Sequence, residues 1–206
     1  MISVIDYGLG NLHSVKNALD FLGVENNVIS TAKELYAADA LILPGVGAFP
    51  DAISALKTRK LFFELKAAAK EIPMLGICLG MQLLFEESDE FGLTEGLGLI
   101  SGRVTKIHAD GLKIPHMGWN ELNICKKDPI IDGVDGGYVY FVHSYKAKCE
   151  ERNIIADTAY GERIPTLVKA DNIIVYGAQF HPEKSDSVGL KILNNFVKII
   201  NMRQYK

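Results

Sequence analysis

The segment from Ile72 to Glu86 decides the fold, and it reads Ile-Pro-Met-Leu-Gly-Ile-Cys-Leu-Gly-Met-Gln-Leu-Leu-Phe-Glu. Its first part is a short apolar run typical of a buried strand, and residues 81–86 have a helix-like pattern. Cys78 lies between Gly76 and Gly80, which is the cysteine counterpart of the G-x-S-x-G nucleophile elbow. Glycines suit such a turn because the nucleophile is held in a strained conformation and a neighbouring Cβ would collide with the returning strand. We therefore predict a strand, a sharp turn and a helix, with Cys78 clear of the sheet.

A cysteine at such a turn is suited to covalent catalysis. The thiolate is the reactive form of the side chain. Unpaired backbone N–H groups and the positive end of the helix dipole favour that anion at a helix N-terminus. The motif therefore predicts that the sulfur of Cys78 is a nucleophile.

Composition narrows the class of protein. The chain has 206 residues, 48% of them hydrophobic and 23% charged, with a formal net charge of −3. This length predicts one domain over residues 1–206. No basic excess is available to neutralise phosphates, which argues against a nucleic-acid partner. We expect neither export nor a membrane span, since the sequence has no basic leader and no apolar run of about 18 residues.

The cysteine count points to a reducing compartment. The chain has three cysteines, Cys78, Cys125 and Cys149, an odd number at wide spacing. Such a set does not make a disulfide framework. We expect a cytoplasmic protein in which Cys125 and Cys149 are structural.

Short apolar runs alternate with helical patterns in the first half of the chain. The expected strands there are 2–5, 27–29, 41–43 and 74–77, and the expected helices are 12–22 and most of 50–69, with a capping box from Thr31 to Glu34. The second half has turn-rich strands at 101–106, 138–142, 154–156, 166–168 and 173–180, followed by a closing helix that begins near 185–187. The predicted fold class is α/β, with a mostly parallel central sheet flanked by helices and extended by antiparallel strands.

A thiolate nucleophile needs a proton shuttle, and His181 is the best candidate among the five histidines. It follows the predicted strand 173–180, and Glu183 lies two residues later on the same side of the chain. A carboxylate bonded to one ring nitrogen fixes the tautomer and leaves the other nitrogen for the thiol. A His-x-Glu pair alone is more often a structural or surface pair. With the elbow upstream, Cys78, His181 and Glu183 are interpreted as a catalytic triad.

Acyl transfer also needs hydrogen-bond donors for the developing oxyanion. The backbone N–H of Leu79, just after the nucleophile, is one candidate. Gly45, Val46 and Gly47 follow a strand of the same sheet, and their flexibility would let a second N–H, that of Val46, turn toward the site. Without the elbow, this segment would be interpreted as an ordinary glycine turn.

The sequence does not support a dinucleotide-binding site or a metal site. Gly8 and Gly10 follow the first strand, but His13 replaces the third glycine of a dinucleotide-binding G-x-G-x-x-G. The remaining histidines and cysteines lack compact metal-ligand spacing, so we expect no metal and no cofactor. His108 and His116 are expected at the surface, and His143 is either a core histidine or part of a substrate loop.

At this point the sequence resembles the class I (triad) glutamine amidotransferases. The shared motifs are Gly-x-Cys-x-Gly at 76–80, Gln82 four residues after the cysteine, and His-Pro-Glu at 181–183. Four further segments, at 6–12, 44–49, 115–120 and 181–185, are similar to the glutaminase subunits of imidazole glycerol phosphate synthases. The resemblance covers essentially the whole chain.

This resemblance implies that Cys78 attacks the carboxamide of glutamine, that His181, oriented by Glu183, protonates the departing ammonia, and that water hydrolyses the γ-glutamyl thioester. It also implies a set of substrate-binding residues: Gln82, Glu90, His143, Ser144 and Tyr145.

In the family the ammonia passes to a separate cyclase subunit with a (β/α)₈ barrel fold, in histidine biosynthesis. The residues expected to face this partner are Asn11, Trp119, Tyr140 and Lys184. Trp119, the sole tryptophan, could instead be a core residue. Two alternative functions stay open: a paralogous subunit that supplies ammonia for amidation of a surface-polysaccharide sugar precursor, and a noncatalytic scaffold, against which the intact triad argues.

Overall fold

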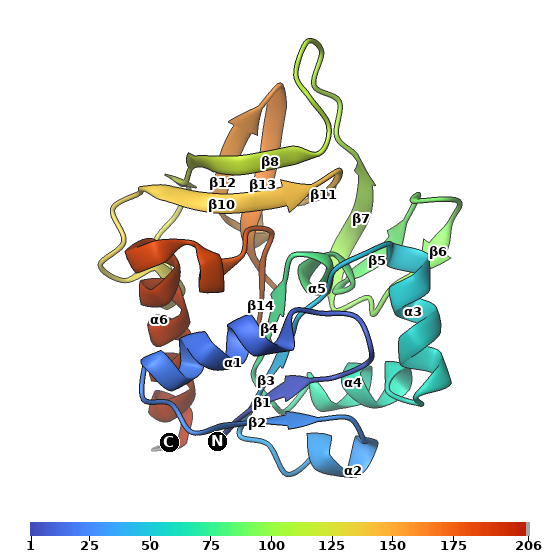
Figure 1. Cartoon of the computed structure of the whole chain (residues 1–206), viewed down its shortest axis with the longest axis vertical. Helices are drawn as coiled ribbons and strands as arrows, with labels where there is room; N and C mark the ends of the chain where they lie inside the picture. The colour runs from blue at the N-terminus through green and yellow to red at the C-terminus, as the bar shows by residue number, and fades with distance from the viewer. Residues whose placement is uncertain (205–206) are drawn as a thin grey trace.

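The computed structural model describes residues 1–204. An eight-stranded sheet runs through the centre in the order β2-β1-β3-β4-β14-β13-β12-β9 (Figure 1). Its strands are β1 (Ile2–Ile5), β2 (Asn26–Ile29), β3 (Ala40–Leu43), β4 (Met74–Ile77), β9 (Asn123–Ile124), β12 (Ile154–Tyr160), β13 (Glu162–Lys169) and β14 (Val175–Ala178). The five strands from β2 to β14 pair in parallel, and β13, β12 and β9 extend the sheet antiparallel. The predicted fold class is confirmed.

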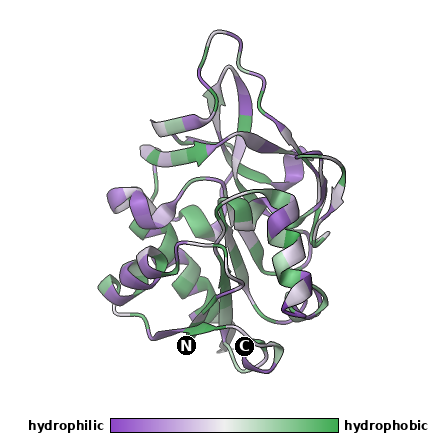
Figure 2. Cartoon of the chain, turned by 45° about the vertical axis from the view of Figure 1, so that its right-hand side comes forward, coloured by the Kyte–Doolittle hydropathy of each residue, from purple (hydrophilic) through white to green (hydrophobic). Residues whose placement is uncertain are grey.

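Helices cover both faces of this sheet. They are α1 (Leu12–Phe21), α2 (Ala32–Leu35), α3 (Phe49–Thr58), α4 (Phe62–Ala68), α5 (Leu79–Gln82) and α6 (Asp186–Gln204). Because side chains alternate along a strand, Val4 and Ile42 pack in one core cluster with α1 and α6, whereas Ile5 and Leu43 pack in another with α3 and α4. Figure 2 shows the central strands coloured hydrophobic along their length, which fits a sheet buried on both faces.

Local signals in the sequence account for several helix ends. The Asn11 side chain accepts a hydrogen bond from the Ser14 N–H at the start of α1, and the predicted Thr31–Glu34 capping box is present. The helical stretch expected within 50–69 forms as two helices, α3 and α4. Lys60 lies between them with φ of +60°, a conformation that no helix can continue through.

Two smaller sheets complete the fold. One contains β5 (Phe85–Ser88), β6 (Thr94–Glu95), β7 (Ile100–Lys106) and β11 (Tyr145–Cys149), and the other pairs β8 (His116–Glu121) with β10 (Tyr138–His143). Short 3₁₀ helices occur at η1 (Pro129–Ile131), η2 (Glu151–Asn153) and η3 (Pro182–Lys184). The β8–β10 ribbon crosses beyond the carboxyl ends of the parallel strands, the end of the sheet at which α5 follows β4 (Figure 1).

The helix after Cys78 is shorter than the sequence predicts. It ends at Gln82, and Phe85 and Glu86 belong to β5. The run Leu83, Leu84 and Phe85 is fully buried, and its carbonyl groups accept hydrogen bonds from the backbone of residues 97–100. Tertiary pairing with this returning segment therefore overrides the helix-like pattern.

The strand expected at 173–180 is likewise confined to residues 175–178 of β14. Within residues 1–204, no helix is both long and apolar enough to cross a membrane.

Candidate active site

The chain forms the predicted elbow at Cys78. Cys78 has φ of +55° and ψ of −112°, and its N–H donates to the carbonyl of Ala178 at 2.7 Å. A Cβ on Gly76 would lie 2.6 Å from the carbonyl oxygen of Gly80, and a Cβ on Gly80 would overlap the carbonyl oxygen of Leu43. Both glycines are therefore required by close backbone approach, which leaves the cysteine as the side chain presented at the turn.

His181 and Glu183 form a buried pair beside the elbow. His181 Nδ1 lies 2.8 Å from Glu183 Oε1, and the side chains are 3% and 1% exposed. The other ring nitrogen, Nε2, is buried and makes no fully formed hydrogen bond with the described residues. His181 and Cys78 line the same pocket, so Nε2 is the nitrogen available to the thiol.

Burial disfavours the charged form of His181, but interactions with Cys78 and with the Glu183 carboxylate outweigh it and raise the pKa of His181 to about 10. At neutral pH the imidazole is thus held in its protonated form. A ring in this state can donate a proton to a departing amine.

The pocket at Cys78 has a volume of about 330 Å³. It brings together segments that are far apart in the sequence, and its lining residues are Val46, Gly47, Cys78, Leu79, Gln82, Glu90, Pro115, Val142, His143, Ser144, Tyr145 and His181. All five predicted substrate-binding residues are in this set. Gly45 lies just outside it, in a narrow adjoining crevice that His181 and Glu183 also line.

Hydrogen bonds fix the polar side chains of the pocket. Gln82 Nε2 donates to the carbonyl of Tyr145 and to Gln179 Oε1, both at 3.0 Å. Gln179 Nε2 in turn points at Cys78 Sγ at 3.9 Å. Sequence reasoning missed Gln179, although a polar residue at the end of an apolar strand, two positions before His181, was a usable signal.

Glu90 is held at the rim of the pocket by the Phe49 N–H, which donates to Glu90 Oε2 at 2.7 Å. Burial raises the pKa of Glu90 despite this bond, and the nearby carboxylates Asp51 and Asp89 act in the same direction. An ammonium group bound beside Glu90 would favour its charged form and so oppose the effects of burial and of the nearby carboxylates. Glu90 is therefore suited to contact the α-amino group of a substrate.

The segment predicted to supply oxyanion donors borders the pocket. Val46 is 42% exposed, and the N–H groups of Val46 and Gly47 make no backbone hydrogen bond in the described part of the chain, so this backbone is little restrained. Gly45, in contrast, has no room for a Cβ, which would lie 2.6 Å from Tyr7 Oη. That hydroxyl is buried without a hydrogen-bond partner in the described structure, and burial together with Cys78 raises the pKa of Tyr7. Tyr7 is therefore a neutral donor next to Gly45, and this role was not predicted from the sequence.

The expectation that His116 lies at the surface is wrong. It is 2% exposed, with its ring stacked on Phe141 at 4.6 Å and on Tyr160 at 4.0 Å between ring centroids. His143 is also buried, and it lines the pocket, so its two proposed environments are both present. His108 is exposed, as expected.

We expect the folded state to lose stability in mild acid because of His116 and His143. Burial lowers the pKa of His116 to about 4 and, with the charges of neighbouring histidines, lowers that of His143 to about 3. The unfolded chain therefore binds more protons than the folded chain below pH about 6.5, and stability falls from there toward pH about 4. The limiting slope is about 1.4 kcal/mol per pH unit for each histidine.

Urea unfolding at a series of pH values measures this slope. His116→Asn should flatten the profile, whereas His108→Asn, at an exposed histidine, should leave it unchanged. Equal profiles for all three proteins would refute the assignment.

Three of the residues predicted to face a partner gather on the β8–β10 ribbon and η3. Trp119 is 53% exposed, its ring centroid lies 6.1 Å from that of Tyr140, and Lys184 Nζ lies 6.0 Å from the same Tyr140 ring. This exposure excludes the alternative that Trp119 is a core residue. The fourth residue, Asn11, has a structural role in addition, because its side chain caps the N-terminus of α1.

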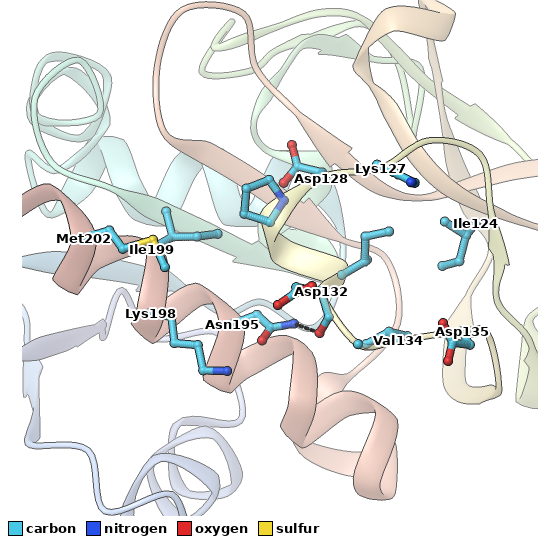
Figure 3. A pocket seen from close by; sticks show the side chains of 13 residues that line it. Ile124, Lys127, Asp128, Asp132, Val134, Asp135, Asn195, Lys198, Ile199 and Met202 are labelled. Atoms are coloured by element: carbon cyan, nitrogen blue, oxygen red, sulfur yellow. Dashed lines mark hydrogen bonds between the residues drawn. The ribbon is translucent and has the colours of Figure 1, made fainter.

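A larger cavity, of about 850 Å³, lies against η1 and the C-terminal half of α6 and shares no lining residue with the Cys78 pocket (Figure 3). Two of its polar side chains make hydrogen bonds within the fold. Asp128 bonds Lys169 and Tyr176 at 3.0 Å each, and the Asn195 amide donates to the carbonyls of Ile130 and Asp132. These bonds stabilise the fold, whereas Asn195 Oδ1 is buried without a hydrogen-bond partner in the described structure.

Comparison with known proteins agrees with this geometry. The glutamine amidotransferase class-I family matches residues 3–200. The chain belongs to that family. Among its relatives, the imidazole glycerol phosphate synthase subunit HisH of Listeria innocua serovar 6a is 50% identical over 201 residues, 97% of this chain and 96% of the relative. The HisH subunit of Geobacillus thermodenitrificans is 49% identical, over 99% of this chain and 98% of the relative.

Solved structures show the same glutamine amidotransferase fold at lower identity. A crystal structure of a glutamine amidotransferase superposes with a TM-score of 0.76 at 20% identity, covering 97% of this chain and 98% of that one. The structure of PurLQS from Thermotoga maritima gives a TM-score of 0.76 at 21% identity, with the same coverage. At these identities the likeness concerns the fold.

Proposed function

We propose that this chain is the glutaminase subunit of an imidazole glycerol phosphate synthase, forming a single domain over residues 1–206. Membership of the class-I amidotransferase family and identity near 50% to HisH subunits support this function. The observation that carries it is the Cys78 elbow facing the buried His181–Glu183 pair across one pocket. The three free cysteines suit a reducing cytoplasm.

In the first step the Cys78 thiolate attacks the carboxamide carbon of glutamine and forms a tetrahedral oxyanion. The N–H groups of Leu79 and Val46, the latter in the segment bounded by Gly45 and Gly47, are the donors that we assign to this anion. When the C–N bond breaks, His181 supplies the proton with which nitrogen leaves as ammonia, and Glu183 holds the ring in orientation.

In the second step water attacks the γ-glutamyl thioester. His181, now neutral, accepts the water proton, the C–S bond breaks, and glutamate and the thiolate are released. Gln82 and the backbone of residues 143–145 orient the α-carboxylate and α-amino groups of the substrate, with Glu90 near the amino group.

The ammonia then passes to a cyclase subunit with a (β/α)₈ barrel fold, in a heterodimer. Tunnelling has a physical basis, since ammonia released into neutral water is mostly protonated and loses its nucleophilicity. The group formed by the exposed Trp119 and Lys184 and the half-buried Tyr140, together with Asn11, the N-cap of α1, is the surface that we assign to this partner. Tryptophan and tyrosine side chains such as Trp119 and Tyr140 are typical of interface centres.

A paralogous function in sugar amidation would need the same glutaminase chemistry and differs only in the partner. The HisH relatives favour the histidine pathway. Titration of the chain with each candidate synthase subunit, while following product formed from glutamine, separates the two.

We expect weak glutamine hydrolysis by the isolated chain and strong stimulation by the cyclase subunit with its nucleotide ligand. The physical reason is the loosely restrained segment at Val46 and Gly47, whose donors must be oriented before they stabilise the oxyanion. Glutamate release with and without the partner measures this effect. Full activity of the isolated chain would contradict the coupling.

A further inference from the structure

A continuous row of hydrogen bonds runs behind the Cys78 pocket. Asn120 Nδ2 lies 3.4 Å from His116 Nε2, His116 Nδ1 lies 3.0 Å from His143 Nε2, and His143 Nδ1 lies 2.8 Å from the carbonyl oxygen of Tyr145. His143 and Tyr145 line the pocket, whereas His116 and Asn120 do not. The row therefore connects residues outside the pocket to its wall.

At each contact of this row, the atom that donates the hydrogen bond and the atom that accepts it can be assigned. A carbonyl only accepts, so the proton of His143 is on Nδ1. In a neutral ring Nε2 then accepts, which requires His116 to carry its proton on Nδ1 and to accept at Nε2 from the Asn120 amide. Neither ring has a carboxylate partner in the described part of the chain, and both are buried, which keeps them neutral.

The far end of the row is anchored independently. Asn120 Nδ2 also donates to the carbonyl of Ala159 at 3.0 Å, and Asn120 Oδ1 accepts from the Glu121 N–H at 2.8 Å. The amide therefore cannot rotate and present oxygen to His116 without losing both bonds. The His116 ring is also fixed by its stacking on Phe141 and Tyr160.

We propose that His116 and Asn120 are positioning residues for glutamine, which act by holding His143 as its Nδ1–H tautomer and so fixing the Tyr145 carbonyl. That carbonyl also accepts from Gln82, so the row and Gln82 hold the 143–145 backbone from two sides. The inference rests on the proposed role of residues 143–145 in substrate binding. A shift of the 143–145 backbone should therefore weaken glutamine binding more than it slows the chemical step.

Kinetics with paired substitutions at His116 test this role. His116→Leu removes the donor to His143, and we expect KM for glutamine to rise about tenfold or more while kcat of the partner-activated protein changes by less than about threefold. In His116→Asn the amide nitrogen takes the place of Nδ1, so this variant should recover most of the lost affinity. Tyr160→Phe keeps the stacked ring and serves as the packing control, with KM unchanged. An equal rise in KM for the two His116 variants, or none for either, would overturn the proposal.

Nitrogen-15 NMR of the histidine rings tests the row in the wild-type protein, independently of whether any variant folds. We expect His116 and His143 both to show a protonated Nδ1 and a bare Nε2. An Nε2–H tautomer or an imidazolium at either ring would contradict the assignment. This spectrum does not depend on catalysis, so failure of the row and failure of the glutaminase function are distinguishable.

Discussion

Replacing Cys78 with alanine should abolish glutamine-dependent synthesis, with hydrolysis reduced by at least about 10³-fold. The substitution removes the sulfur that forms the acyl intermediate, and no other cysteine lines the pocket. Synthesis from added ammonium salt should continue at the wild-type rate in the complex with the cyclase, because the partner needs only ammonia. Both rates are measured on the same assembled complex.

The matched control is Cys149→Ala, at a partly buried cysteine outside the pocket, which should leave both rates unchanged. If Cys78→Ala still hydrolyses glutamine, the nucleophile is misassigned. Loss of the ammonium-dependent rate as well would show that the substitution disturbs the complex rather than the chemistry.

Gly80→Ala should have the largest effect on stability. The added Cβ would overlap the carbonyl oxygen of Leu43 in the neighbouring strand β3, and the backbone on both sides is buried. Neither segment can move without separating α5 from the sheet, so we expect a cost of about 3 kcal/mol or more. Urea unfolding measures the free energy, and glutamine hydrolysis should be lost with it.

Gly23→Ala is the comparison. Gly23 has φ of +69° but nothing within 4 Å of an added Cβ, so only the conformational cost of about 1–2 kcal/mol applies. A stability loss in Gly80→Ala no greater than in Gly23→Ala would show that close approach does not hold the elbow together.

The parts of the fold that depend on short-range signals could be predicted from the sequence. The spacing of Gly76 and Gly80 around Cys78 predicted the elbow, and Thr31 and Glu34 predicted a capping box, because each structure is specified by residues a few positions apart. Apolar runs bounded by turns likewise predicted the parallel core of the sheet.

Features that depend on distant segments could not be predicted in this way. The pattern after Cys78 favoured a longer helix, but pairing with residues 97–100 made Phe85 part of a strand. His116 was predicted at the surface because no residue near it in the sequence indicates burial. The rings that bury it belong to Phe141 and Tyr160, on other strands. Gln179 did have a local signal, its position just after an apolar strand, but its contact with Gln82, almost a hundred residues away, could not be predicted.

The proposed site residues rest both on short-range sequence motifs and on contacts between distant segments. Local motifs indicated Cys78, His181 and Glu183, and the structure brings all three to one location. The substrate-binding assignments followed from family resemblance, and they remain predictions whose geometry fits. The role of Tyr7 could not be predicted, because it depends on the buried hydroxyl lying against Gly45, which only the folded structure shows.

The most direct measurement concerns the covalent intermediate on sulfur. The complex is mixed with isotopically labelled glutamine, quenched in acid during turnover and digested, and the labelled peptide is identified by mass spectrometry. We expect a γ-glutamyl group on Cys78, which disappears when the labelled substrate is chased. Turnover without any covalent label, or a label on Cys125 or Cys149 instead, would contradict the mechanism.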